Sequence, residues 1–161
     1  MLEYFGDDWA PLEARVEPGH HFEWVWLLHE FERLTGEDQG QVIASLMDFG
    51  LKGVDAEGLA IDEMDAGGHW LVRSRKLWAQ TEMLKALIVL AERGAKASEW
   101  RIPALVDAIF ERFMVPGEAP LWFEAIAEDG QPLRTRMPAT TLYHLMLGFM
   151  ELRRFAAASR Q

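Results

Sequence analysis

The chain has 161 residues, half of them hydrophobic, which is enough for one domain with a sizeable core. Its formal charge is −10, from 26 acidic and 16 basic residues. Nucleic acids and anionic membranes need clustered Lys and Arg, so neither is expected as a partner. The absence of cysteine excludes disulfides and thiolate zinc sites.

The sequence gives no sign of a leader or a membrane anchor. Residues 1–10 carry Asp7 and Asp8 and lack the basic start and apolar run of a signal peptide. No apolar stretch approaches the roughly 18–20 residues that a membrane span needs. We therefore expect a cytoplasmic protein with a single domain over residues 1–161.

The first half of the chain predicts two helices and a hairpin after an irregular entry over residues 1–18. Residues 20–34 are apolar around nearly the whole circumference of a helix, which is typical of a buried, inner helix. Residues 38–51 place their apolar side chains on one side, as an outer helix does. Between residues 52 and 76 the apolar period falls to about two, and Asp65-Ala66-Gly67-Gly68 predicts a hairpin turn.

The second half predicts a helix over residues 77–93 that ends before Gly94, and another over residues 98–113. A second hairpin is expected around residues 129–130, and a last helix runs from about 138 or 140 to 157. The fold class is therefore all-α with short β-hairpins, and about five helices alternate between inner and outer positions. Alternate helices of an up-and-down array run parallel, so the three inner helices start at the same end.

His20 is the first candidate for chemistry, because it shares a helix face with Glu23. The positive end of the helix dipole disfavours an imidazolium, so His20 is expected to stay neutral near pH 7 and accept a proton, with Glu23 orienting it or binding a hydroxyl. In an alternative interpretation, His20 caps the helix while Glu23 bonds back to the backbone. A third interpretation is a metal site formed by His20, His21 and Glu23. Adjacent histidines diverge by about 100° on a helix, however, and therefore chelate a metal poorly together. No metal site is predicted.

His144 is the second candidate. A lone histidine among apolar residues of a helix is often a hydrogen-bonded core residue. Its position near the start of an inner helix places it around one mouth with His20 and Trp78. Two neutral imidazoles facing one cavity can remove a proton from a carbon and return it to the same or the other face. The sequence has no phosphate loop, nucleophile elbow or cysteine nucleophile, so histidine acid–base chemistry is the catalysis that its motifs favour.

Trp78 and Glu82 are four residues apart and lie on one helix face. An indole beside a carboxylate suits a sugar, because the C–H face of the sugar stacks on the ring while hydroxyls donate to the acid. In the alternative interpretation, Trp78 belongs to the core and Glu82 is solvated. The remaining tryptophans, Trp9 and Trp26 among them, are interpreted as packing residues.

Four segments resemble the N-acylglucosamine 2-epimerase family, which includes cellobiose 2-epimerases and mannose isomerases. The run PGHHFEWVWLL at residues 18–28 is similar to a signature of the family, and KLWAQTE at residues 76–82 to its aromatic, sugar-stacking segment. Residues 122–130 resemble its late hairpin and residues 138–144 its last inner helix. The segments occur in the family's order with similar spacing and cover essentially the whole chain.

The resemblance implies an (α/α)6 barrel with its active site at one mouth and no obligatory cofactor. His20 and His144 would be the acid–base pair that moves a proton at C2 of an open-chain aldose or N-acyl amino sugar, through an enediol or an enolate. Glu23 would support His20 and assist ring opening. Trp78 would form part of the sugar platform, with Glu82 as a further substrate-binding residue beside it.

The family barrel has twelve helices, so five helices correspond to its C-terminal part, from roughly the eighth helix onward. The earlier helices supply an arginine and other substrate contacts in the family. Without neighbours the inner helices would expose more contiguous apolar surface than a monomer usually tolerates, so self-association or a missing N-terminal half is expected to cover them. The predicted function is a carbohydrate isomerase or 2-epimerase, or the catalytic part of one. The alternative is a non-catalytic half-barrel that binds sugar or a complementary chain.

Overall fold

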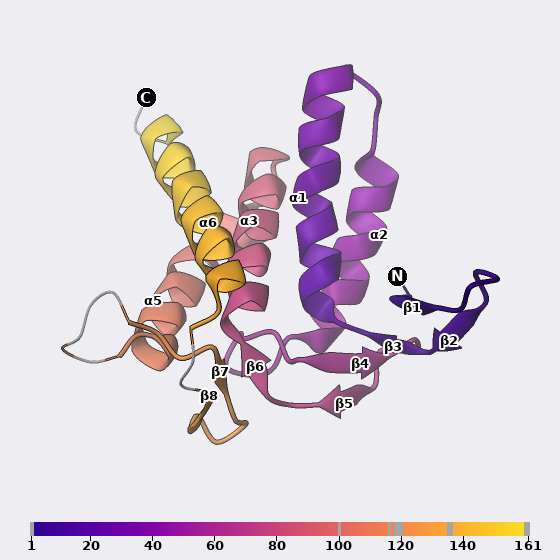
Figure 1. The fold of residues 1–161 in the computed structure, drawn as a ribbon. Helices are drawn as coiled ribbons and strands as arrows, with labels where there is room; N and C mark the ends of the chain where they lie inside the picture. The colour runs from indigo at the N-terminus through magenta and orange to yellow at the C-terminus, as the bar shows by residue number, and fades with distance from the viewer. Residues whose placement is uncertain (1, 100, 116, 118–120, 135–136, 160–161) are drawn as a thin grey trace.

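A computed structural model describes residues 2–99, 101–115, 117, 121–134 and 137–159, and shows two layers of helices with short strands at one end (Figure 1). Three helices form the inner layer, with the second of them in the middle: α1 (Pro18–Thr35), α3 (Leu77–Glu92) and α6 (Ala139–Ala158). The outer helices are α2 (Gly40–Gly50), which packs on α1, and α5 (Arg101–Phe113), which packs on α3. Two short helices complete the set: the 3₁₀ helix η1 (Leu51–Gly53) and α4 (Lys96–Glu99).

The strands form three small antiparallel sheets. The first is the hairpin of β1 (Tyr4–Phe5) and β2 (Pro11–Glu13). The second has the order β3 (Arg15–Val16), β4 (Glu63–Asp65), β5 (Trp70–Val72). The third has the order β6 (Arg75–Lys76), β7 (Ala125–Ile126), β8 (Pro132–Arg134).

The inner helices start at the sheet end, as the alternation of inner and outer helices predicts. β3 leads directly into α1 and β6 directly into α3, while α6 follows the sheet of β6, β7 and β8 (Figure 1). The predicted helices and both predicted hairpins are confirmed. The expected helix over residues 98–113 is in fact the short α4 followed by α5, and Gly94 takes the left-handed φ of 89° expected of a residue that follows a helix.

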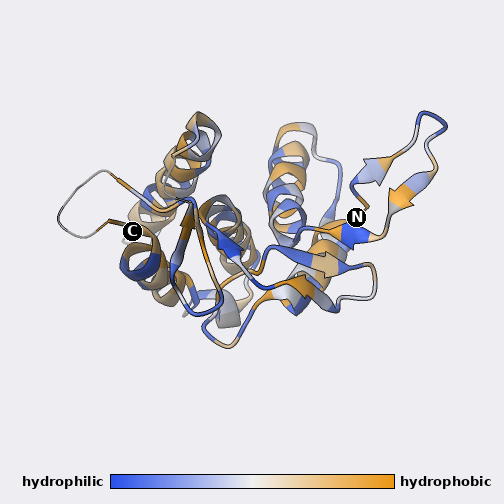
Figure 2. Cartoon of the chain, turned by 60° about the horizontal axis from the view of Figure 1, so that its bottom comes forward, coloured by the Kyte–Doolittle hydropathy of each residue, from blue (hydrophilic) through white to orange (hydrophobic). Residues whose placement is uncertain are grey.

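The prediction of an irregular entry is wrong. Arg15 pairs with Asp65 and Val16 with Met64, so the segment is held by strands that lie about fifty residues away in sequence. The β1–β2 hairpin projects from the rest of the molecule (Figure 2). Trp9, expected to pack, lies in its turn with a φ of 62° and 81% of its surface exposed.

Helix α3 is the centre of the core. Every residue from Ala79 to Val89 is buried, because α1, α5 and α6 surround the helix. Its apolar side chains join those of the other helices in one cluster. Burial of this kind is the main favourable term in folding, at roughly 25 cal/mol for each Å² removed from water.

The flanking inner helices α1 and α6 keep large apolar side chains exposed. On α1 these are Trp24, Leu27, Phe31 and Leu34. On α6 they are Leu142, Tyr143, Met146 and Met150. The expectation that all three inner helices would be exposed is therefore wrong for α3, which its two neighbours cover, and it holds for α1 and α6. Among the described residues, no helix is long and apolar enough to cross a membrane.

Candidate active site

A pocket of about 310 Å³ opens at the end where the inner helices begin. Four of the five residues predicted for the site line it: His20, Glu23, Trp78 and His144. The fifth, Glu82, does not line the pocket and is fully buried behind it, contrary to the expectation of a direct contact with sugar. The remaining lining residues are Lys76, Glu124, Pro138, Thr140, Thr141 and Tyr143.

The indole of Trp78 lies close to both predicted catalytic imidazoles. Its ring centroid is 4.9 Å from that of His20 and 5.4 Å from that of His144. The close approach of α1 to α3 depends on Gly19, since a Cβ there would come within 2.6 Å of the Trp78 ring. On the other side of His144, the ring of Tyr143 lies 3.9 Å away. The two histidines, which are 124 positions apart in the sequence, thus line one pocket beside the same aromatic ring.

Glu3 orients His20. The His20 Nδ1 lies 3.1 Å from a Glu3 carboxylate oxygen. This hydrogen bond raises the pKa of His20 above its ordinary value, although partial burial opposes the shift. Burial also works to raise the pKa of Glu3, but hydrogen bonds from His20 and from the backbone N–H of Glu17 outweigh it and lower that pKa. The helix dipole favours a neutral His20, and a carboxylate from the N-terminal segment shifts the pKa of His20 in the opposite direction.

Glu82 orients His144 from the opposite side. The His144 Nδ1 lies 2.6 Å from Glu82 Oε1, and both side chains are buried. The second oxygen, Oε2, lies 2.7 Å from the ammonium of Lys85, one turn further along α3. Each imidazole of the pocket is thus held by a carboxylate through Nδ1, which leaves Nε2 as the ring nitrogen free for proton transfer.

His21 packs between α1 and α2 and does not line the pocket. Its Nδ1 is 3.2 Å from the backbone carbonyl of Glu17, and its ring stacks on Phe49 at 4.9 Å. It is buried on the side of α1 that faces α2, so the metal set of His20, His21 and Glu23 is not assembled.

Two other clusters hold the residue types that bind metals. In one, Glu3, Glu17 and His20 bring potential ligand atoms within 4.8 Å of one another; in the other, Glu23, Glu82 and His144 do so. Glu3 and Glu82 already accept hydrogen bonds from the histidines of their own clusters. The second cluster places Glu23 beside His144 and Glu82, so Glu23 belongs with both histidines at this mouth rather than with His20 alone.

The sequence reasoning missed several polar residues of the site. Lys76 reaches the pocket and pairs with Asp62 at 2.6 Å. Glu124 is buried at the pocket wall and accepts a 2.6 Å hydrogen bond from the Thr141 hydroxyl. Lys76 is the first residue of the segment at residues 76–82 that resembles the sugar-stacking segment of the family, so the sequence offered a reason to include it. Glu124 and Glu3 lie in segments without helical period, so no sequence pattern indicates that their side chains face the site.

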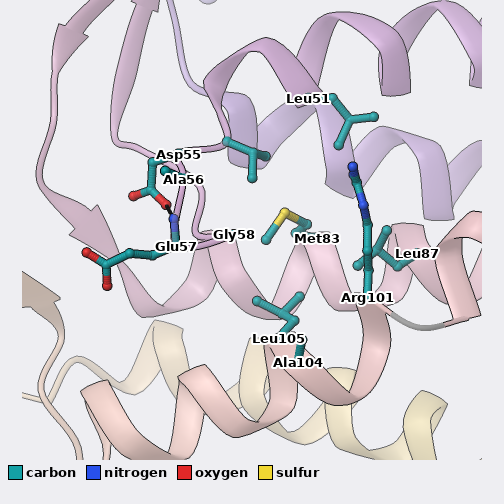
Figure 3. A pocket seen from close by; sticks show the side chains of 11 residues that line it. Leu51, Asp55, Ala56, Glu57, Gly58, Met83, Leu87, Arg101, Ala104 and Leu105 are labelled. Atoms are coloured by element: carbon teal, nitrogen blue, oxygen red, sulfur yellow. Dashed lines mark hydrogen bonds between the residues drawn. The ribbon is translucent and has the colours of Figure 1, made fainter.

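A second pocket, of about 380 Å³, lies away from the two histidines (Figure 3). Leu51, Met83, Leu87 and Leu105 form much of its apolar wall, between η1, α3 and α5. Asp55 and Glu57 lie at its edge and are paired with Arg75. It contains none of the predicted site residues.

A family match and a curated relative both connect the chain with sugar epimerases and isomerases. Residues 1–148 match the N-acylglucosamine 2-epimerase (GlcNAc 2-epimerase) family. A mannose-6-phosphate isomerase of Rhizobium meliloti (strain 1021) is 33% identical over 162 residues, which cover 94% of this chain and 42% of the relative. The chain thus spans about two fifths of the length of this relative.

Solved structures share the fold. A D-mannose isomerase matches with a TM-score of 0.78 and 20% identity, over 93% of this chain and 43% of its own. A cellobiose 2-epimerase from Bacillus thermoamylovorans B4167 matches with the same TM-score and identity, over 92% of this chain and 40% of its own. A cellobiose 2-epimerase from Spirochaeta thermophila DSM 6192 matches with a TM-score of 0.72 and 23% identity, over 96% of this chain and 41% of its own.

These likenesses identify the helical array as part of an (α/α)6 barrel. The family match covers most of the chain, including the segments that carry His20, Trp78 and His144. The chain belongs to the N-acylglucosamine 2-epimerase family of sugar isomerases and epimerases.

Proposed function

We propose that the chain carries the proton-transfer site of a sugar isomerase or 2-epimerase, with His20 and His144 as its acid–base pair. The observation that carries this proposal is the placement of both imidazoles in one pocket, each beside the indole of Trp78. The substrate is an open-chain aldose or N-acyl amino sugar, whose C2 proton is acidified by the adjacent carbonyl.

His144 is the base in this proposal. Glu82 accepts the Nδ1 hydrogen and so leaves the Nε2 lone pair to take the proton from C2. The electron pair of the C2–H bond forms the enediol or enolate, with the negative charge on the carbonyl oxygen. Glu82 acts on the sugar only through His144, which replaces the substrate-binding role expected for it.

His20 is the acid. Because Glu3 raises its pKa, more of His20 is imidazolium near neutral pH than of an ordinary histidine. It can donate its Nε2 proton to the intermediate at C2 for epimerisation. For isomerisation it donates to C1 after the proton of the O2 hydroxyl has moved to O1, so that C2 becomes the carbonyl carbon. Both reactions share the first deprotonation, so the same pair serves either.

The remaining pocket residues bind and open the sugar. Trp78 offers the apolar platform for the C–H face of the ring. Glu23 lies beside His144 at the mouth, where a carboxylate can take the proton of the anomeric hydroxyl during ring opening. Lys76 and Glu124 offer a cation and an acceptor for hydroxyl groups.

The proposal includes a partner for the open faces of α1 and α6. In the solved relatives the region matched here is about two fifths of the chain. We propose that a further set of helices, from a second copy or from an N-terminal half, covers these faces. The same exposed faces favour the second candidate function, a non-catalytic half-barrel that binds sugar or a complementary chain.

The experiment that separates these functions is solvent-deuterium incorporation at C2 of mannose, followed by NMR. The wild-type chain is compared with His144→Asn and with His69→Asn, which alters an exposed histidine far from the pocket. Exchange that falls about 10²-fold or more in His144→Asn, and is unchanged in His69→Asn, supports the proposal. No exchange by a well-folded wild-type chain would contradict catalysis by this chain on its own and favour the non-catalytic half-barrel.

A further inference from the structure

Lys85 is a buried cation in the middle of the apolar core helix. Its side chain is only 2% exposed, in a helix whose other buried residues are mostly apolar. A buried ammonium is costly unless it is paired. The pairing here is specific: Nζ lies 2.7 Å from Glu82 Oε2 and 4.2 Å from the ring centroid of Trp26 on α1. Lys85 therefore connects α1, α3 and, through Glu82, α6.

The two carboxylate oxygens of Glu82 contact different residues, one of them His144 and the other Lys85. Oε1 accepts from His144, and Oε2 faces Lys85. Glu82 is fully buried, so its carboxylate is shielded from bulk solvent. We propose that Lys85 is a positioning residue for His144, which acts through Glu82 by holding that carboxylate in place and offsetting its negative charge. The catalytic consequence rests on the proposed function above, whereas the effect on the imidazole does not.

The physical effect of Lys85 is electrostatic. A lone buried carboxylate beside an imidazole would favour the imidazolium and hold its proton to higher pH. The ammonium on the far side of Glu82 offsets part of that negative charge while the carboxylate still holds the Nδ1 hydrogen of His144. Among the described residues, the other titratable groups that line the pocket with His144 are His20 and Glu23 from α1, Lys76 from β6, Tyr143 on α6 itself and Glu124 at the pocket wall. Lys85 is the group that contacts the second oxygen of Glu82.

The test is an NMR titration of the imidazoles in the full chain labelled with ¹⁵N and ¹³C histidine. The variants are Lys85→Met, Lys85→Gln and Lys85→Arg, with Lys96→Met as the control for losing an exposed lysine. His144 is assigned by its absence in His144→Asn. We expect the titration midpoint of His144 to rise by about one pH unit or more in Lys85→Met and in Lys85→Gln. It should stay near wild type in Lys85→Arg and in Lys96→Met.

Lys85→Gln keeps a polar side chain of similar length beside Glu82 and so serves if Lys85→Met does not fold. A midpoint that stays within about 0.3 pH unit of wild type in a folded Lys85→Gln would overturn the proposal. An equal rise in Lys85→Arg would also overturn it, since that variant retains the charge. These readouts need no catalytic activity, so they remain decisive if the chain shows no exchange at C2.

Where exchange at C2 is measurable, its pH dependence gives a second readout. The acid limb of the rate profile should move to higher pH in Lys85→Gln, and Lys85→Arg should restore the wild-type profile. A loss of rate at every pH with no movement of the limb would assign Lys85 a merely structural role and overturn the proposal.

Discussion

At the residue scale, the site is organised by carboxylates that hold imidazoles. Glu3 holds His20 and Glu82 holds His144, both through Nδ1. The two pairs differ in their surroundings, because the His20 side chain is 37% exposed while that of His144 is 9% exposed. The pair at the solvent side is suited to exchange its proton with water, and the buried pair is suited to keep a fixed tautomer.

The His20–Glu3 pair predicts a pH-dependent stability. The folded pKa of His20 lies above its ordinary value of 6.5, and that of Glu3 lies below 4.5. The pair is fully stabilising between those two ordinary values; its contribution is lost as the pH rises through the folded pKa of His20 or falls through that of Glu3. Glu3→Gln should therefore destabilise the chain more at about pH 5.5 than at about pH 9 in urea unfolding. A deficit that is equal at both pH values would contradict the ion pair.

Individual site residues could be predicted from sequence only where a regular element carried them. His20, Trp78 and His144 each lie near a helix start, so the parallel inner helices were enough to predict a shared mouth. The sequence predicts the helix that carries Glu82. The helical period does not show, however, that this carboxylate is buried against Lys85 and His144 rather than solvated. Glu3 could not be predicted, because it lies in a segment without helical period and its position depends on contacts with the Glu17 backbone N–H and with His20.

At the element scale, the mouth depends on how closely α1 approaches α3. Trp78 and Ala79 of α3 pack directly on the backbone of α1 at Gly19, where a Cβ would come within 2.9 Å of both side chains. The hydrophobic pattern that predicts the two helices does not specify this spacing. This contact explains physically why a glycine, Gly19, precedes His20 in the segment that resembles the family signature.

Gly19→Ala is expected to displace the Trp78 ring and to cost about 1–3 kcal/mol of unfolding free energy, because a packed ring and backbone cannot both yield. Chemical denaturation measures this cost. Gly40→Ala is the matched control at the start of α2, where the added Cβ meets only the flexible ends of Arg93 and Asp38. Equal stability of the two variants would contradict the close packing at Gly19.

At the scale of the whole molecule, the chain is an arc of three inner helices with two open flanks. The buried α3 shows how an inner helix is completed by neighbours on both sides, whereas α1 and α6 have such a neighbour on one side only. Sequence reasoning predicted the open surface from the number of helices. It could not assign that surface to the flanking helices, because the full enclosure of α3 depends on packing between distant segments.

The open flanks predict self-association of the isolated chain. Light scattering after gel filtration should give a mass above the 18.4 kDa of one chain at micromolar concentration. Phe31→Glu on α1 and Met146→Glu on α6 should lower that mass without loss of thermal stability, since these side chains are 42% and 57% exposed. Leu133→Glu, at an exposed site on β8, is the control and should change nothing. A monomeric wild-type chain would contradict this prediction.

The most direct test of the account is whether His20 and His144 act on the same carbon. The rate of C2 deuterium exchange in mannose is measured for the wild type, His20→Asn, His144→Asn and the double variant. Two groups that act as a unit are non-additive, so the double variant should exchange no more slowly than the slower single variant. Losses that multiply in the double variant, or a single variant that exchanges at the wild-type rate, would contradict a paired acid and base around Trp78.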